Sequence, residues 1–358
     1  MVACPGVVLL EVAETETEPR DPVFSRQHLP AAIPLEAPSV ARLAEAVYSG
    51  AVGALDQALA LATAGDPEAA GDSTSPTLLT LHLVLPPGAE PTLGSRAALL
   101  GREVAARFAT RRRRAWRRFL PPEQAALQWS RVGVVIQILM VERERIWLSV
   151  AAPRPLPGGG TDLAPWPGGA VWIPENRAPP SRAYRKLEEA FAWMGRAPGP
   201  QDLCVDLGAA PGGWTFVALE RGARVVAVDR APLEPPLSRH PRLRMLEGNA
   251  FTFDGTDLDR DPDRDQPVEV RRSRARVRAD WLLCDVVCEP HRSLALIERW
   301  LTERWCHHLV VTIKFKGGAG YGMLGEVRAT LERLGCSRHR IKHLQHNKNE
   351  VTVMASAR

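Results

Sequence analysis

The sequence predicts an α/β protein, with a doubly wound sheet in its C-terminal half and a smaller α+β region before it. From about residue 181, short apolar runs alternate with helical stretches, which is typical of a doubly wound sheet. The first part holds strands and helices of a kind that favours an α+β domain. Residues 153–180 are rich in Pro and Gly and connect the two. We therefore expect domains over 1–170 and 171–358.

In the first region, apolar runs predict strands, and helical periodicity predicts two long helices. The predicted strands are 7–12, 78–85, 131–141 and 145–150, and the predicted helices are 39–63 and 95–119. A stretch rich in Gly, Asp, Ser and Pro, 64–77, predicts a loop.

The second region predicts the doubly wound sheet element by element. Strands are expected at 203–206, 224–229, 244–247, 279–284, 308–313, 340–344 and 350–356, and helices at 181–194, 214–221, 291–304 and 322–334. The charged stretch 254–278 has no periodicity and predicts a solvated insertion. A less favoured alternative is that the stretch grips RNA through a cluster of arginines, Arg271, Arg272, Arg274, Arg276 and Arg278.

Composition narrows the class of protein. The chain has 358 residues and a net charge of +5, a modest fit to a polyanionic partner. No apolar run is long enough to span a bilayer and no secretory pattern opens the chain, so we expect a cytoplasmic protein without a membrane partner. The cysteines are scattered and predict free thiols, and we expect no metal at Cys284, Cys288, His307 and His308, which lack a second pair of suitable spacing.

Residues 206–215, Asp-Leu-Gly-Ala-Ala-Pro-Gly-Gly-Trp-Thr, lie between an apolar run and a predicted helix. Small residues let the backbone approach a ligand, and the first amides of a helix favour negative charge or lone pairs. Asp229 ends the next strand, about 20 residues on, where an acid suits ribose hydroxyls. The pair predicts a nucleoside cofactor site. The incomplete G-x-G-x-x-G disfavours NAD, and a tight turn without a ligand is the alternative.

Four charged residues stand at element ends around this loop: Lys186, Asp285, Lys314 and Glu350. Ligands of open parallel sheets bind outside the carboxyl ends of the strands, which is where Asp285 and Lys314 fall. The chain has only five lysines, so a retained lysine indicates a role that arginine cannot fill, such as losing a proton. For Lys342 and Lys348 we favour chance retention.

The loop and the four charged residues resemble the cofactor loop and the Lys-Asp-Lys-Glu tetrad of FtsJ-like RNA 2'-O-methyltransferases. Residues 284–290, 296–305 and 346–353 further resemble the large-subunit ribosomal RNA cytidine 2'-O-methyltransferases of the RlmM type, as do 23–30 and 166–169 more sparsely. The resemblance implies a Rossmann-like catalytic domain after a THUMP-like, RNA-binding region, with rRNA or its precursor as partner. It also implies S-adenosylmethionine (SAM) as cofactor, held by Asp206, Gly208, Ala209, Pro211, Gly212, Gly213, Trp214, Asp229, Asn249 and Asp285.

By this resemblance, Lys314 would be the general base for a ribose 2'-hydroxyl, and Asp285, Lys186 and Glu350 would orient it. Asn249 stands where related enzymes often carry an acid facing the adenine, and its carbonyl can still accept a hydrogen bond. The alternatives are a methyltransferase acting on another nucleophile or RNA, and an inactive or weakly active RNA-binding or assembly protein. The oligomeric state is not given by the sequence, with a monomer favoured.

The strongest basic cluster is Arg111–Arg114 with Trp116, Arg117 and Arg118. One interpretation is a solvated helix end, since cations are favoured near a helix C-terminus. The other is a phosphate-contacting patch with Trp116 available to stack on a base. The sequence favours neither interpretation over the other.

Overall fold

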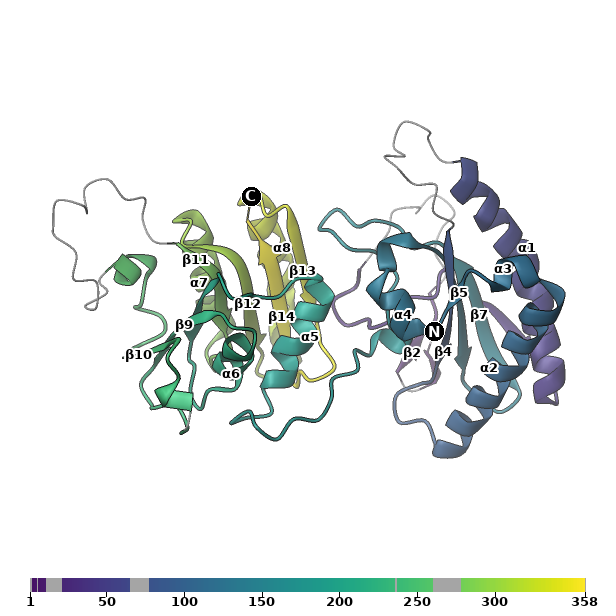
Figure 1. The fold of residues 1–358 in the computed structure, drawn as a ribbon, viewed down its shortest axis with the longest axis horizontal. Coiled ribbons are helices and arrows are strands. Elements are labelled where there is room, and N and C mark those ends of the chain that lie inside the picture. The colour runs from purple at the N-terminus through teal and green to yellow at the C-terminus, as the bar shows by residue number, and fades with distance from the viewer. Residues whose placement is uncertain are drawn as a thin grey trace. The chain divides into compact units, whose positions relative to one another are not determined.

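The structure is a computed structural model that describes residues 2–4, 6–10, 21–64, 77–235, 237–259 and 278–357 (Figure 1). The chain divides into two compact units. Unit 1 comprises Met1–Asp21, Arg26–Leu156 and Thr161–Ala170, and unit 2 comprises Pro22–Ser25, Pro157–Gly160 and Val171–Arg358. Two short segments from the first half of the chain thus pack within unit 2.

Unit 1 is a sheet with helices packed on it. The sheet order is β3-β7-β6-β4-β5, formed by β3 (Ile33–Glu36), β4 (Leu78–Val84), β5 (Phe119–Leu120), β6 (Val132–Met140) and β7 (Arg145–Ala151). Helices α1 (Val40–Ala64) and α2 (Pro91–Arg111) bury apolar side chains such as Leu43, Leu100 and Phe108 in one core with Ile136 and Leu148. A short ladder pairs β1 (Val2–Cys4) with β2 (Val7–Val8).

The helix expected over 95–119 is wrong at both ends. Helix α2 begins at Pro91, whose missing N–H costs nothing in a first turn, and it ends at Arg111 because Arg112 leaves the helical region at φ −131°. A four-residue helix, α3 (Arg113–Trp116), follows, and Phe119 lies in β5 instead. The sequence also missed β3 and α4 (Pro122–Leu127). Most of the expected loop, 65–76, and the end of the expected strand 7–12 lie outside the described residues.

Unit 2 is the doubly wound sheet that the sequence predicts. Its order is β10-β9-β8-β11-β12-β14-β13, formed by β8 (Leu203–Leu207), β9 (Arg224–Asp229), β10 (Leu243–Glu247), β11 (Ala279–Cys284), β12 (Cys306–Lys314), β13 (Arg338–Lys342) and β14 (Glu350–Ser356). Strands β8 to β12 run parallel, and β14 runs antiparallel to β12 and β13. The strand order reverses between β8 and β11, which is where open α/β sheets bind ligands.

Helices cover both faces of this sheet (Figure 1). Helices α5 (Tyr184–Met194) and α6 (Gly213–Glu220) bury Leu187 and Val217 in one core, and α7 (Pro290–Thr302) and α8 (Leu324–Arg333) bury Trp300 and Leu331 in the other. The parallel strands are apolar on both sides, as a sheet covered on both faces requires. No helix in the described part of the chain is long and apolar enough to cross a membrane.

The expectation of a solvated insertion is wrong for the first residues of 254–278. A short 3-10 helix, Gly255–Asp259, follows Phe253, and both Phe253 and Leu258 lie in the core. Gly255 lies so close to Trp305 that an added Cβ would stand 2.3 Å from its ring. At the other end, Arg278 donates to the carbonyl of Cys306 at 2.6 Å. The other arginines of this stretch, Arg271, Arg272, Arg274 and Arg276 of the predicted cluster among them, are outside the described residues.

Chance retention is also wrong for Lys342, which anchors the segment Pro22–Ser25. Lys342 is 4% exposed, and its Nζ donates to the carbonyls of Pro22 at 3.3 Å and Ser25 at 2.7 Å. The backbone N–H of His343 donates to Val23 at 2.8 Å. An ammonium group offers three donors to neighbouring carbonyls, which explains a lysine here.

Candidate active site

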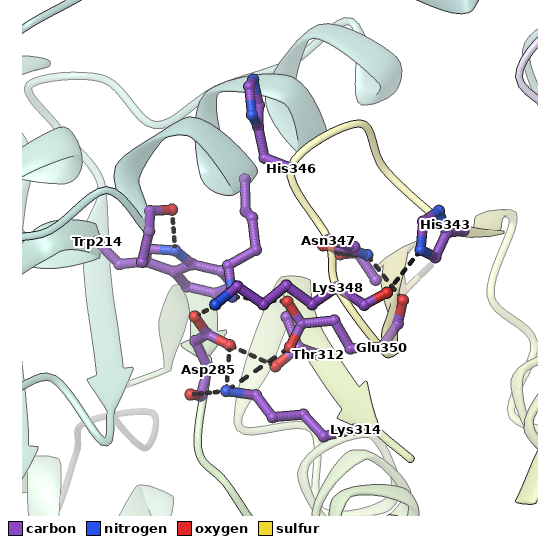
Figure 2. A network of polar contacts seen from close by, with 12 residues as sticks. Trp214, Asp285, Thr312, Lys314, His343, His346, Asn347, Lys348 and Glu350 are labelled. Atoms are coloured by element: carbon purple, nitrogen blue, oxygen red, sulfur yellow. Dashed lines mark hydrogen bonds and ion pairs between the residues drawn. The ribbon is translucent and has the colours of Figure 1, made fainter. Parts of the chain in front are cut away.

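The four charged residues predicted from the sequence meet at the carboxyl ends of the central strands. Lys186 lies on α5, Asp285 directly follows β11, Lys314 ends β12 and Glu350 opens β14. Lys314 and Glu350 are directly paired in the antiparallel ladder. Figure 2 shows Asp285, Lys314 and Glu350 with their side chains directed toward one another.

The distances define one connected ion cluster, which we call the tetrad. Lys186 Nζ donates to Asp285 Oδ2 at 2.5 Å and to Glu350 Oε1 at 3.0 Å. Lys314 Nζ lies 2.9 Å from Asp285 Oδ1 and 3.7 Å from Glu350 Oε2, and donates to the Asp285 carbonyl at 3.0 Å. The side chain of Lys314 is 21% exposed and that of Lys186 is 10% exposed. Lys314 is therefore the lysine better placed to reach a substrate.

Asp285 is held as a carboxylate at the centre of the tetrad. Burial raises the pKa of Asp285, but the charges of Lys186 and Lys314 outweigh burial, so its pKa lies below the ordinary value. Thr312 Oγ1 donates to Asp285 Oδ1 at 2.7 Å and fixes the orientation of the carboxylate. Two lysines and two carboxylates balance, so the cluster avoids the cost of an unpaired buried charge.

The loop between β8 and α6 depends on glycines for its backbone conformation and its packing. Gly208 has φ +75° and Gly212 has φ +118°, where other residues are strained. A Cβ on Gly208 would stand 2.1 Å from a methyl of Val286, the residue after Asp285. The loop is thus packed directly against the strand end that carries Asp285.

Asp229 is positioned by the same loop. Its Oδ2 accepts the N–H of Ala210 and its Oδ1 accepts the N–H of Ala231, both at 3.0 Å. Each carboxylate oxygen keeps a second lone pair, so Asp229 can still accept from two neighbouring ribose hydroxyls. A carboxylate fixed at this strand end fits the ribose of the nucleoside part of SAM.

Asp206 is a buried acid below the loop. It is 1% exposed and accepts from Thr215 Oγ1 at 2.6 Å. Burial, with a contribution from the neighbouring carboxylates Asp285 and Asp229, raises the pKa of Asp206 to about 7. A cationic ligand bound beside Asp206 would favour its charged form. The α-ammonium group and the sulfonium of SAM carry such a positive charge.

The raised pKa of Asp206 predicts a pH-dependent stability. The native state holds this proton up to about pH 7 and the unfolded state releases it near pH 4, so the free energy of unfolding falls as pH rises across that window. Asp206→Asn keeps the acceptor for Thr215 and removes the charge. We expect Asp206→Asn to raise the Tm more at pH 8 than at pH 5, and to weaken SAM binding at pH 8.

Thermal unfolding at the two pH values and calorimetric titration with SAM measure these effects. Asp202→Asn is the matched control, because Asp202 accepts from the Gly199 N–H in a half-buried position away from the loop. A Tm difference between Asp206→Asn and the unsubstituted protein that is the same at both pH values would contradict the prediction.

The other predicted cofactor residues differ in how they are placed. Ala209 and Gly213 are buried and Pro211 is exposed, all on the loop. Trp214 is 3% exposed and its indole N–H donates to the carbonyl of Ala183 at 2.9 Å, so its side chain packs the start of α6 against the residues before α5. Asn249 Oδ1 accepts the N–H of Phe251 at 3.0 Å, which leaves one lone pair and its amide N–H groups for a ligand.

Two residues that support the tetrad were missed in the sequence. Glu189 is 1% exposed and accepts the N–H groups of Gln345 at 2.8 Å and His346 at 3.3 Å, which fixes the loop before Glu350. Thr312 holds Asp285. Spacing could have found both: Glu189 is three residues after Lys186 on one helix face, and Thr312 is two residues before Lys314 on one strand face.

The structure describes the whole basic cluster and the surroundings of five cysteines. Within the described ranges, no three His, Cys, Asp or Glu side chains are grouped so that they could hold a metal ion. Five cysteines there are free. In the basic cluster, Arg111 pairs with Glu45 and Arg112 with Asp56, each at 2.6 Å, and Trp116 packs on Phe119 at 5.1 Å. Arg111 and Arg112 therefore hold α1 and α2 together. This disfavours the phosphate-contacting interpretation for these two residues.

The sheet, the loop and the tetrad define a class of protein. Residues 179–304 match the family model described as FtsJ-like methyltransferase, so unit 2 carries a Rossmann-like methyltransferase domain of the FtsJ-like type.

Relatives give a more specific similarity. The chain is 33% identical over 254 residues to ribosomal RNA large subunit methyltransferase M of Alkalilimnicola ehrlichii, a match that covers 67% of this chain and 62% of that protein. It is 33% identical over 264 residues to the protein of the same name from Pseudomonas paraeruginosa, covering 66% and 64%. The match to the Halorhodospira halophila protein, also 33% identical, covers 53% and 51%. The chain is a relative of these proteins, and the matches span less than two thirds of their length.

Proposed function

We propose that this chain is a SAM-dependent RNA methyltransferase that methylates a ribose 2'-hydroxyl of large-subunit ribosomal RNA. One observation carries the proposal: the tetrad stands at the strand ends directly beside the glycine loop, whose Ala210 N–H fixes the carboxylate of Asp229. The names of the relatives support rRNA as the substrate. The resemblance described above adds cytidine as the target nucleotide.

The geometry suits proton removal from an alcohol. SAM supplies a methyl group on a positively charged sulfur when bound. Lys314, the more exposed lysine, is the group placed to take up the proton of the 2'-hydroxyl. Asp285 holds Lys314 through both its carboxylate and its carbonyl, and Lys186 bridges Asp285 and Glu350 so that neither carboxylate turns away. Fixing the reacting groups in this way contributes several kcal/mol to lowering the barrier.

Unit 1 fits the role of an RNA-binding domain within this proposal. Its mixed sheet and paired helices are compatible with the THUMP-like region that the resemblance implies. Arg113, Arg114 and Arg117 are exposed at the end of the basic cluster and can contact phosphates. The proposed partner of the whole chain is large-subunit rRNA or its precursor.

Mapping of 2'-O-methyl groups on rRNA tests the function. In a strain without the gene, we expect one ribose methylation of large-subunit rRNA to disappear. It returns when the protein is supplied and does not return with Lys314→Ala. An unchanged map contradicts the proposal. SAM calorimetry separates the remaining alternative, since RNA binding without SAM binding would indicate a non-enzymatic RNA-binding protein.

A further inference from the structure

A half-exposed aromatic ring, Phe24, lies on the segment Pro22–Ser25, which is anchored at the end of β13. Phe24 is 48% exposed, and its ring centroid lies 4.9 Å from that of Tyr321 and 5.8 Å from that of His343. The backbone on either side of Phe24 is held by Lys342 and by the N–H of His343. Part of the phenyl ring is therefore open to solvent on an anchored backbone.

Tyr321 connects this ring to the catalytic strands. Its hydroxyl donates to Asn349 Oδ1 at 2.8 Å, and Asn349 Nδ2 donates to the carbonyl of Phe315 at 2.6 Å. Phe315 follows Lys314 and Asn349 precedes Glu350, and the Phe315 N–H donates to the Asn349 carbonyl at 2.9 Å. The aromatic group is therefore tied to the residues one step beyond the paired ends of β12 and β14.

Two exposed lysines lie on the segments that carry this group. Lys316 is 85% exposed, lies two residues after Lys314 and pairs with Glu289 at 2.5 Å. Lys348 is exposed in the loop before Glu350, and its carbonyl accepts from His343 Nε2 at 2.8 Å. Aromatic faces flanked by cations are what proteins use to hold unpaired nucleotides, because every base has a π-face and every linkage a phosphate.

We propose that Phe24, Tyr321 and His343 form an aromatic platform that stacks on an unpaired RNA base next to the methylated nucleotide. The inference rests on the proposed function and extends it: the substrate must present its target in a single-stranded or unstacked segment. The 2'-hydroxyl has to reach Lys314, which is 21% exposed, and a splayed strand allows a neighbouring base to leave the stack and lie on Phe24.

The experiment compares Phe24→Ala with Phe24→Trp in the full chain. Trp172→Ala is the matched control, because Trp172 is an exposed aromatic residue of unit 2 at 81% exposure. The probe is a fluorescein-labelled, unstructured RNA of about 12 nucleotides, within the size that such surfaces cover. Fluorescence anisotropy gives its Kd, and methyl transfer to unmodified large-subunit rRNA gives KM and kcat.

We expect Phe24→Ala to weaken RNA binding about tenfold, as loss of one base-stacking contact does. KM for RNA should rise more than kcat falls, and SAM affinity and Tm should stay unchanged. Phe24→Trp should restore binding. The proposal is overturned if Phe24→Ala binds RNA normally, if Trp172→Ala loses as much affinity, or if the affinity for RNA falls only together with the Tm, which would make Phe24 a packing residue.

The two proposals fail separately. If the unsubstituted protein transfers no methyl group to rRNA but binds the probe in a Phe24-dependent way, the proposed function fails and the aromatic platform stands. If methyl transfer is observed and Phe24→Ala changes neither KM nor Kd, the platform fails and the proposed function stands.

Discussion

Replacement of Lys314 by alanine is expected to lower kcat for RNA methylation by about 10²–10⁴-fold, the range that a general base contributes. Lys314→Arg should be impaired to a similar extent, since arginine keeps the charge and does not give up its proton in proteins. SAM affinity should change little, because the partners of Lys314 are Asp285 and Glu350 rather than Asp229 or the cofactor loop. Single-turnover methyl transfer and SAM calorimetry measure the two effects independently.

Arg333→Ala is the control for Lys314. Arg333 is a basic residue of the same unit that pairs with Glu298 at 2.7 Å on the surface, and surface pairs contribute little. Near-normal turnover by either Lys314 variant would show that Lys314 is not the base, whatever the state of the other tetrad residues. A loss of turnover with an equal loss of SAM binding would assign Lys314 to the cofactor instead.

Replacement of Asp285 by alanine is expected to reduce both stability and activity. It leaves Lys186 and Lys314 close together with Glu350 as their one remaining tetrad partner, and breaking a buried ion pair costs about 3–5 kcal/mol. Denaturant unfolding measures this loss. Glu298→Gln, which removes an exposed pair with Arg333, should stay within about 0.5 kcal/mol of the unsubstituted protein.

The pH dependence has a defined sign for Asp285. Its pKa is lowered in the folded state, so its contribution to stability is present above pH 4 and is lost as the pH falls through the lower folded-state pKa. The unsubstituted protein should therefore lose stability on acidification below pH 4, and Asp285→Asn should lose less over the same interval. Equal acid sensitivity of the two proteins would contradict the central position of Asp285 in the ion cluster.

The sequence predicted the sheet of unit 2 and the membership of the tetrad because both depend on local signals. Apolar strands end in chemically distinctive residues, and parallel strands place their ends at one edge. What it could not predict were pairings between distant segments. Nothing near Arg112 signals the end of α2, and nothing near Lys342 signals that Pro22 and Ser25 supply its acceptors.

The same limit applies to the cofactor residues. The loop from Gly208 to Trp214 was predicted as one ligand-binding unit, but only the structure separates its members by role. Gly208 packs against Val286, whereas the indole N–H of Trp214 donates its hydrogen bond to the carbonyl of Ala183. Asn249 was expected to accept a hydrogen bond, and part of that capacity is taken by Phe251. The role of each residue toward SAM stays a prediction.

The anchoring of Pro22–Ser25 by Lys342 has a consequence for the order in which the chain acquires its structure. The contact joins residues about 320 positions apart, so it can form only when almost the whole chain has left the ribosome. Contacts of such long sequence separation form late, because their loop-closure entropy must be overcome first. Until then the ammonium group of Lys342 lacks its carbonyl acceptors. A fragment that begins at Val171 would keep every residue of the tetrad. It would still lack Pro22–Ser25, the segment whose carbonyls accept from Lys342 at the end of β13.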